Sequence, residues 1–184
     1  MARHRIASSG LVVAVLALAA CSGPEEPKEV APNAPPTTQA PAAPTPQPPV
    51  ASGGATVGGD GSEIRLDALT PADVEGAKLA GELGCSFSTA GATPLLLAMG
   101  DVASKDAAQG VVKVAGYVER VAAPGGFDGM LKGATFSGAG KTIRIAVTGP
   151  AIGGGESPPT PATLTYERAE GASKTFVGRW VCGP

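Results

Sequence analysis

Histidine and aromatic residues are scarce in this chain. One histidine, His4, occurs in 184 residues, and tryptophan, tyrosine and phenylalanine together make up 4 %. Because His4 lies in a segment that we expect to be removed, the mature protein lacks the histidine of a Ser-His-Asp triad or a Cys-His pair. It also lacks an imidazole ligand for zinc. We therefore expect no metal and no cofactor.

Clusters of basic residues are also missing. The net charge is −2, from 14 Lys and Arg against 16 Asp and Glu, and no basic stripe stands out. Phosphate backbones are bound by clustered Lys and Arg, so the sequence argues against a nucleic-acid partner.

The N-terminal segment has three parts. Arg3 and Arg5 precede an apolar run from Leu11 to Leu18, and small residues then lead to Cys21. This layout is typical of a secretory signal peptide, here residues 1–20. The apolar run is about half of the ~20 residues that span a bilayer, so we expect no permanent transmembrane helix.

The segment Leu18-Ala19-Ala20-Cys21 resembles the lipobox of bacterial lipoproteins. The resemblance implies cleavage before Cys21 and fatty acylation (for example with palmitate) of that residue, and two or three chains anchor a protein stably. In a Gram-negative host, Ser22 after the cysteine implies the outer membrane, facing the periplasm. The alternatives are the outer face of the cytoplasmic membrane or the cell surface, and an ordinary signal peptide followed by an incidental cysteine.

Proline is concentrated in the segment that follows the cysteine. Residues 21–60 are rich in Pro, Ala and Gly and have almost no large apolar side chain. Such a stretch cannot offset the entropy cost of folding, so we predict a disordered linker. If extended, it would reach on the order of 100 Å at ~3.1 Å per residue.

Two cysteines remain after Cys21, namely Cys85 and Cys182. Leftover thiols in an exported protein usually pair, so we predict a structural disulfide. Two buried thiols or a redox couple are the alternatives, and the absence of a CxxC motif disfavours the redox couple.

Residues 61–184 are predicted to form one mainly β (α+β) domain. Thr70 is a suitable N-cap and Pro71 a suitable first residue for a helix that Gly84 would end. Alternating apolar residues and glycine turns predict strands over 85–87, 94–102, 111–114, 117–122, 134–137, 142–148, 163–168 and 174–182. We expect a small antiparallel sheet, sandwich or barrel, with the helix packed against it or plugging one end.

The triplet Gly140-Lys141-Thr142 resembles the end of a phosphate-binding P-loop. That motif needs a glycine at position 135, which is Thr135, and a helix after the triplet, where this sequence alternates like a strand. We interpret the triplet as part of a hairpin turn and expect no nucleotide.

The sequence also gives no support to a catalytic serine or to a catalytic pair of acids. Ser157 lies next to Glu156 in a long loop, 149–161, without the GxSxG elbow of a serine hydrolase. A carboxylate-based hydrolase needs two acids that face each other across a cleft. The acids of the domain are scattered and most are expected at the surface; they include Glu63, Asp67, Asp73, Glu75, Asp101, Glu119, Asp128 and Glu156.

We therefore expect a non-enzymatic envelope lipoprotein that binds or organises an envelope protein or glycan. Its anchor, size, strand content and two domain cysteines are similar to those of the membrane-bound inhibitors of c-type lysozyme. That resemblance carries no inhibitory residue onto this chain. A carboxylate-based hydrolase of envelope glycans is the remaining alternative.

Overall fold

The computed structural model describes residues 53–90 and 93–184. The predicted signal peptide, Cys21 and most of the predicted linker therefore lie outside the described residues. The described elements are β1 (Leu66–Asp67), α1 (Pro71–Ala77), β2 (Leu83–Ser88), β3 (Leu96–Gly100), β4 (Ala108–Val114), β5 (Tyr117–Ala123), the 3-10 helix η1 (Asp128–Met130), β6 (Thr135–Gly138), β7 (Lys141–Val147), β8 (Thr160–Arg168) and β9 (Ser173–Gly183).

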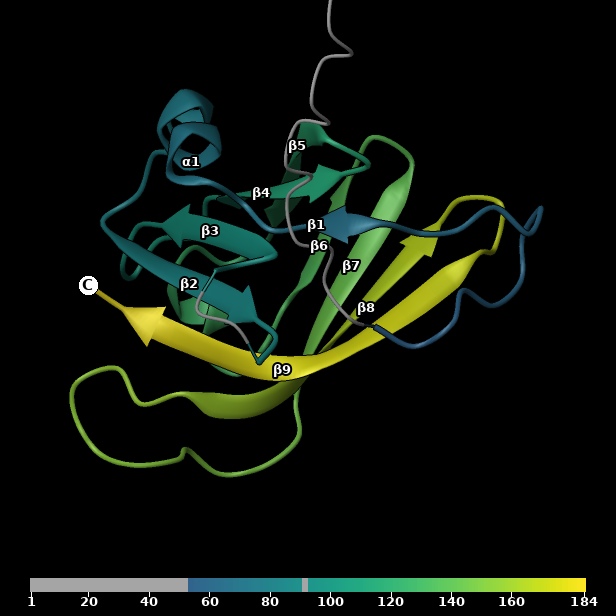
Figure 1. Cartoon of the computed structure of the whole chain (residues 1–184). Helices are drawn as coiled ribbons and strands as arrows, with labels where there is room; N and C mark the ends of the chain where they lie inside the picture. Colours follow the sequence, from purple (N-terminus) through teal and green to yellow (C-terminus); the bar gives the residue numbers. More distant parts are fainter. Residues whose placement is uncertain (1–52, 91–92) are drawn as a thin grey trace, which may run out of the picture. The chain divides into compact units, whose positions relative to one another are not determined.

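Eight of the strands form a closed antiparallel barrel (Figure 1). From β2 to β9 each strand pairs with the next along the chain, and β9 closes the barrel by pairing with β2, where Cys182 lies opposite Cys85. The extra strand β1 lies beside the end of β4, with Leu66 opposite Val114. The predicted mainly β fold is confirmed, and of the three predicted arrangements the barrel is the one observed.

Alternation along each strand sends one set of side chains into the barrel. The four largest fully buried side chains are Trp180, Phe87, Phe136 and Phe176. Phe136 meets Trp180 edge to face, with ring centroids 6.5 Å apart. Eight strands enclose just enough room for side chains, and here aromatic and aliphatic residues fill it. The interior is thus a packed core.

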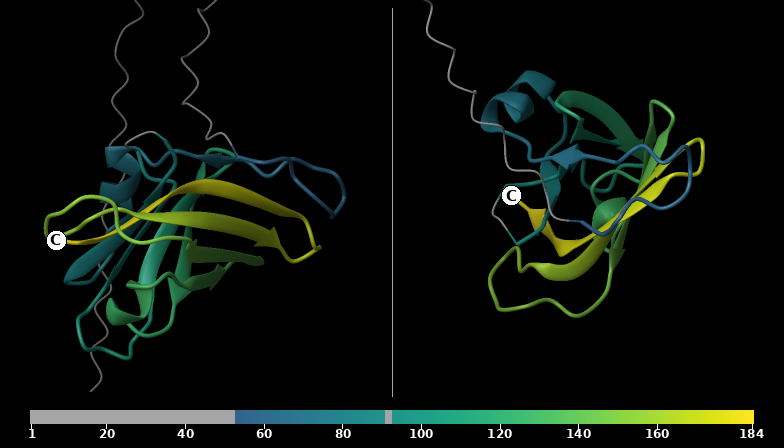
Figure 2. Two further views of the ribbon diagram at one scale, coloured as in Figure 1. Left: turned by 90° about the horizontal axis from the view of Figure 1, so that it is seen from below. Right: turned by 45° about the vertical axis from the view of Figure 1, so that its right-hand side comes forward.

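One end of the barrel, which we call the plug end, is closed by η1. Met130 is fully buried there, and the indole N–H of Trp180 donates a hydrogen bond to the Met130 carbonyl at 2.8 Å. The backbone N–H of Phe127 donates to the Asp101 carbonyl at 3.1 Å, which ties η1 to the β3–β4 connection. The C-terminus and the long β7–β8 connection lie at this end (Figure 2).

The opposite end, which we call the strap end, is crossed by residues 53–67, the strap. The strap starts beside β9, where Gly54 N–H donates to the Thr175 carbonyl at 3.0 Å and Val57 pairs with Ser173. It ends as β1 on β4. A Cβ at Gly53 would lie 2.5 Å from the Phe176 ring, so only glycine fits this approach. Residues 53–60, assigned to the linker on composition, thus contact the barrel.

Helix α1 begins as predicted but ends early. Thr70 and Asp73 form a capping box, and Pro71 is the first helical residue. The helix ends at Lys78, whose φ of 47° is left-handed, and not at Gly84. Gly84 lies in β2, opposite Gly183 of β9. Residues that the sequence pattern assigned to the end of the helix therefore belong to the strand that closes the barrel. The predicted helix end is wrong because a distant strand pairing overrides a weak local preference.

The helix covers part of the outer surface of the barrel. Leu69 and Ala77 pack on Val111 of β4, with Leu97 of β3 against the same cluster. It neither fills the barrel nor plugs an end, because η1 and the strap occupy those positions.

Candidate functional site

The predicted disulfide is present. Cys85 and Cys182 are bonded across the β2–β9 pairing that closes the barrel. Cys85 is fully buried, and both cysteines lie towards the plug end. The other predicted site residue, the lipidation site Cys21, lies outside the described residues and stays a prediction.

The Gly140-Lys141-Thr142 triplet forms the hairpin turn that was predicted. Ala139 and Gly140 turn the chain between β6 and β7 with positive φ angles of 48° and 72°. Lys141 points into the barrel, where it is 8 % exposed and forms an ion pair with Glu119 of β5. Its Nζ also donates to the Ala139 carbonyl at 3.2 Å. The lysine side chain is therefore buried inside the barrel, where it pairs with an acid and is not available to a nucleotide.

Five of the acids that the sequence analysis considered form ion pairs or accept hydrogen bonds from backbone N–H groups. Lys113 Nζ lies 2.9 Å from Asp73, and Lys174 Nζ lies 3.1 Å from Glu63. The other contacts follow the same pattern: Asp67 accepts a hydrogen bond from Gly116 N–H, Asp128 accepts one from Ala103 N–H, and Glu119 pairs with Lys141. Each of these carboxylates is thus held in place by a donor group.

The Ser157 loop lies against the C-terminus. Ser157 lines a hollow of about 260 Å³ with Gly84, Cys85 and Gly183, while Glu156 is exposed. This hollow borders the disulfide. Ser157 thus places the β7–β8 loop beside the barrel wall.

The outer surface of β6 to β9 carries rows of hydroxyl groups that no element of the described chain covers. Side chains that face the same way in neighbouring strands form the row Ser137, Thr142, Glu167 and Ser173 and the row Thr135, Arg144, Thr165 and Thr175. Thr163, opposite Val177, continues the pattern. We call the surface formed by these ten residues the hydroxyl face. Strands lie about 4.8 Å apart, so the hydroxyls form a regular array of short side chains.

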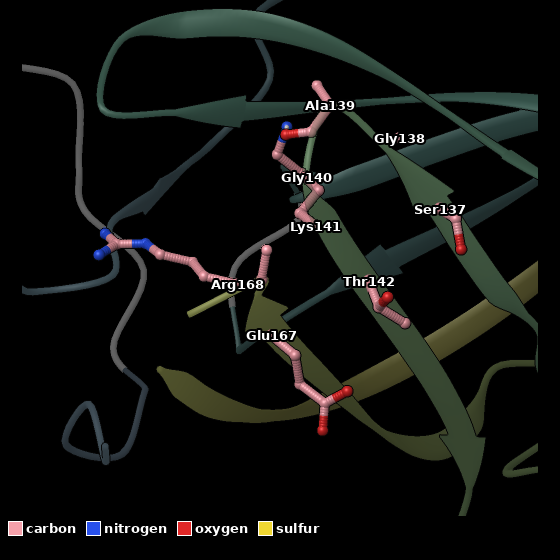
Figure 3. A pocket seen from close by; sticks show the side chains of 9 residues that line it. Ser137, Gly138, Ala139, Gly140, Lys141, Thr142, Glu167 and Arg168 are labelled. Carbon is pink, nitrogen blue, oxygen red and sulfur yellow. Dashed lines mark hydrogen bonds between the residues drawn. The ribbon is translucent and has the colours of Figure 1, made fainter. Parts of the chain in front are cut away.

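The hydroxyl face ends in a hollow at the strap end (Figure 3). Its volume is about 370 Å³, and its lining includes Ser137, Thr142 and Glu167 from one hydroxyl row and the turn at Gly140. Figure 3 shows Glu167 and Arg168 extending from β8 in different directions. Arg168 reaches the strap, where its guanidinium donates to the Ser62 hydroxyl at 2.6 Å. The carboxylate of Glu167 is exposed and remains on the face.

No family model, curated protein or solved structure matches this chain.

A belt of ionisable side chains lies inside the barrel below the strap. Lys174 is 8 % exposed and donates to the Ile64 carbonyl at 3.0 Å, with its ammonium 5.6 Å from the centre of the Phe176 ring. Tyr166, opposite Lys174 in the register, is almost fully buried. Burial and the negative charge of Glu119 raise the pKa of Tyr166 above its usual value of 10.0. Within this belt, Lys174 is the residue that contacts the strap, through the Ile64 carbonyl and the Glu63 carboxylate.

The buried lysines and the hydroxyl face were not among the predicted site residues. The sequence of β7 does indicate that Lys141 is buried, because Lys141 alternates with Thr142 and shares a face with Ile143 and Ile145. Thr163 and Thr165 alternate with buried Leu164 in the same way. Alternation thus marks one side of each strand as outward, but it does not tell which strands become neighbours.

Two further observations concern the described part of the chain. Within residues 53–90 and 93–184, no group of three His, Cys, Asp or Glu side chains is placed to hold a metal ion. None of the helices found there is long and apolar enough to cross a bilayer.

Proposed function

We propose that this protein is a lipid-anchored, non-enzymatic envelope module that binds an envelope polysaccharide across its hydroxyl face. The anchor is the acylated Cys21 that the lipobox-like segment implies, and the paired Cys85 and Cys182 suit an exported, oxidising location. The outer membrane, facing the periplasm, is the location that Ser22 favours.

The observation that carries the binding proposal is the array of hydroxyls on β6 to β9. The barrel interior is filled, so a ligand has to bind on the outside. Hydroxyls are both donors and acceptors, and so they suit the hydroxyls of a glycan. Because the array repeats with the strand spacing, it suits a repeating polymer better than one small molecule. Arg144 and Glu167 add one charge of each sign.

The arrangement of the acids supports a non-enzymatic role. Glu167 lines the hollow at the strap end, Asp73 lines the hollow beside α1, and no acid lines the hollow at the disulfide. A two-carboxylate hydrolase needs a pair of acids across one cleft.

The binding proposal is tested by co-sedimentation of the mature chain, made soluble by Cys21→Ser, with insoluble cell-wall glycan. The triple variant Thr142→Val, Thr165→Val, Thr175→Val keeps the β-branched shape and removes three hydroxyls. Each hydrogen bond contributes about 1 kcal/mol, so we expect binding to weaken at least about tenfold. Thr148→Val, outside the face, is the control. Unchanged binding by the triple variant would contradict the proposal.

The anchor is tested separately. Cells that express the full chain are labelled with a clickable palmitate analogue, and the membrane and soluble fractions are compared for the wild type and Cys21→Ser. We expect the label to be lost from the variant and the variant to leave the membrane fraction. A Cys21→Ser protein that keeps the label would disprove acylation at this residue.

Inhibition of a basic enzyme such as a lysozyme is a second candidate. The connections at the plug end expose Val102 and Leu131 beside two acids, Glu82 and Asp128, that accept hydrogen bonds from Val102 N–H and Ala103 N–H. An apolar contact with acidic neighbours suits a basic protein partner. A lysozyme turbidity assay in which excess protein leaves the rate of wall lysis unchanged would exclude this candidate.

A further inference from the structure

A second hollow lies between α1 and the outer surface of β4 and β5. Its volume is about 350 Å³, and its lining includes Gly76 and Ala77 of α1, Val111 of β4, and Val118 and Arg120 of β5. It lies on the other part of the barrel wall from the hydroxyl face, because α1 packs on β3 and β4 (Figure 1).

The part of the lining that α1 supplies consists of Asp73 and the small residues Ala72, Gly76 and Ala77. The helix has seven residues, and Ala77 is the one that it buries. A Cβ built on Gly76 would meet no atom within 4 Å, so the space beside it is open. Val111 beneath the helix is fully buried, whereas Val118 at the rim is 40 % exposed. The hollow therefore has an apolar floor and an apolar edge that water reaches.

Arg120 gives this hollow a positive charge that nothing in the described chain neutralises. Its guanidinium donates to the Ala77 carbonyl at the end of α1. No ion pair to Arg120 is found within the described ranges, although Asp73 lines the same hollow. A guanidinium has five N–H donors, so others remain for a ligand.

Asp73 pairs with Lys113 and not with Arg120. One oxygen, Oδ2, accepts from Thr70 N–H and from the Thr70 hydroxyl, each at 2.8 Å, and from Lys113 Nζ at 2.9 Å. The charges of Asp73 and Lys113 cancel, and the charge of Arg120 is left over. Arg120 is thus the lining residue to which an anionic group can bind.

We infer that this hollow binds a small aliphatic carboxylate, with its chain between α1 and Val118 and its carboxylate on the guanidinium of Arg120. A planar guanidinium matches a carboxylate in a two-pronged geometry. The volume falls in the range of small-molecule sites, about 300–1,000 Å³. A protein partner would need about 1,000 Å² or more of contact, which seven lining residues do not offer. This inference does not depend on glycan binding.

The test uses octanoate as the probe and the mature chain with Cys21→Ser, in isothermal titration calorimetry without detergent. Arg120→Leu removes the charge, and we expect octanoate affinity to fall at least about tenfold. Gly76→Leu places a side chain in the open space and is expected to abolish binding, with a melting temperature at or above that of the wild type because leucine is the better helix former. Arg179→Leu, on an exposed arginine of β9, is the matched control and should bind like the wild type.

The ligand series separates the contributions of the two halves of the probe. Octan-1-ol, which lacks the carboxylate, and acetate, which lacks the chain, are both expected to bind at least about tenfold more weakly than octanoate. Equal octanoate binding by the wild type and Arg120→Leu would overturn the inference, as would the absence of saturable binding to the wild type. Binding of a peptide with an apolar C-terminal residue in place of octanoate would also overturn it. Far-UV circular dichroism of each variant checks that α1 is retained.

Discussion

Apolar side chains are buried at both ends of the barrel, but the other contacts that close the two ends differ. At the plug end, Met130 is buried against Trp180 and a disulfide joins the neighbouring strands β2 and β9. At the strap end, Lys174 and Lys141 are buried inside the wall and pair with Glu63 and Glu119. Apolar burial and a covalent bond are insensitive to salt, whereas ion pairs with an exposed partner are screened by it. Ile64 and Leu66 of the strap are also buried, so salt is expected to weaken only the ion-pair share of the strap-end closure.

The largest expected effect is at the plug end. Replacing both Cys85 and Cys182 by Ala removes a bond that closes a sequence separation of 97 residues. In the chain-entropy model this lowers the free energy of unfolding by about 4–5 kcal/mol. Urea unfolding followed by Trp180 fluorescence measures the change. A loss below about 1 kcal/mol would show that the bond contributes little to the barrel closure.

The next prediction concerns η1. Met130→Ala leaves a cavity under a fully buried side chain, and we expect a loss of about 2–5 kcal/mol. Because the contact is apolar, the loss should be the same in dilute buffer and at high salt. Urea unfolding at two sodium chloride concentrations tests this, and a loss that depends strongly on salt would contradict the apolar account of the plug end.

The sequence predicted the strands of both ends better than it predicted their closure. The pattern of β7, with Ile143 and Ile145 alternating with polar residues, is local, and so are the turns at Gly116 and Gly140. The pairing of β2 with β9 joins residues about 97 positions apart, and the predicted disulfide was the one sign in the sequence that these two strands meet. The strap looks like linker because Gly54 and Val57 contact the barrel through backbone groups. The hydroxyl face emerges only when the strand order is known.

The strap end should respond to a change of charge. Lys174→Met keeps the buried stem and removes the donor to Ile64 and Glu63. Glu63 is largely exposed, so the expected loss of stability is about 1 kcal/mol, mainly from the hydrogen bond to the Ile64 carbonyl.

Hydrogen exchange of the strap gives the sharper readout for this variant. Exchange of the backbone N–H groups of Gly54 and Val57 should accelerate in Lys174→Met and, in the wild type, at high salt. Lys132→Met, on an exposed lysine near the plug end, is the control and should leave both rates unchanged. Equal exchange in all three proteins would mean that Lys174 does not hold the strap.

The last prediction concerns α1, where the expected effect is as small as that of Lys174→Met at neutral pH and smaller still in acid. Burial raises the pKa of Asp73, but hydrogen bonds from Lys113 and Thr70 outweigh it, so the pKa lies below its ordinary value of 3.8. A lowered folded-state pKa stabilises the protein above the unfolded pKa, and this contribution is lost as the pH falls through the folded value.

The change that isolates this contribution is Asp73→Asn. We expect it to cost about 1 kcal/mol at neutral pH through the helix cap, and the difference from the wild type should shrink below about pH 4. Thermal unfolding of both proteins between pH 7 and pH 3 measures the difference. A gap that stays constant down to pH 3 would contradict a role for the charged form of Asp73.

The measurement that tests the central proposal most directly is a search for glycan binding, and for its location, on the barrel. Amide chemical shifts of the mature chain with Cys21→Ser are followed by NMR during titration with soluble fragments of cell-wall glycan. The account predicts that the shifts concentrate on β6 to β9, at residues such as Thr142, Thr165 and Thr175. Shifts confined to the plug end, or none at saturating glycan, would contradict it.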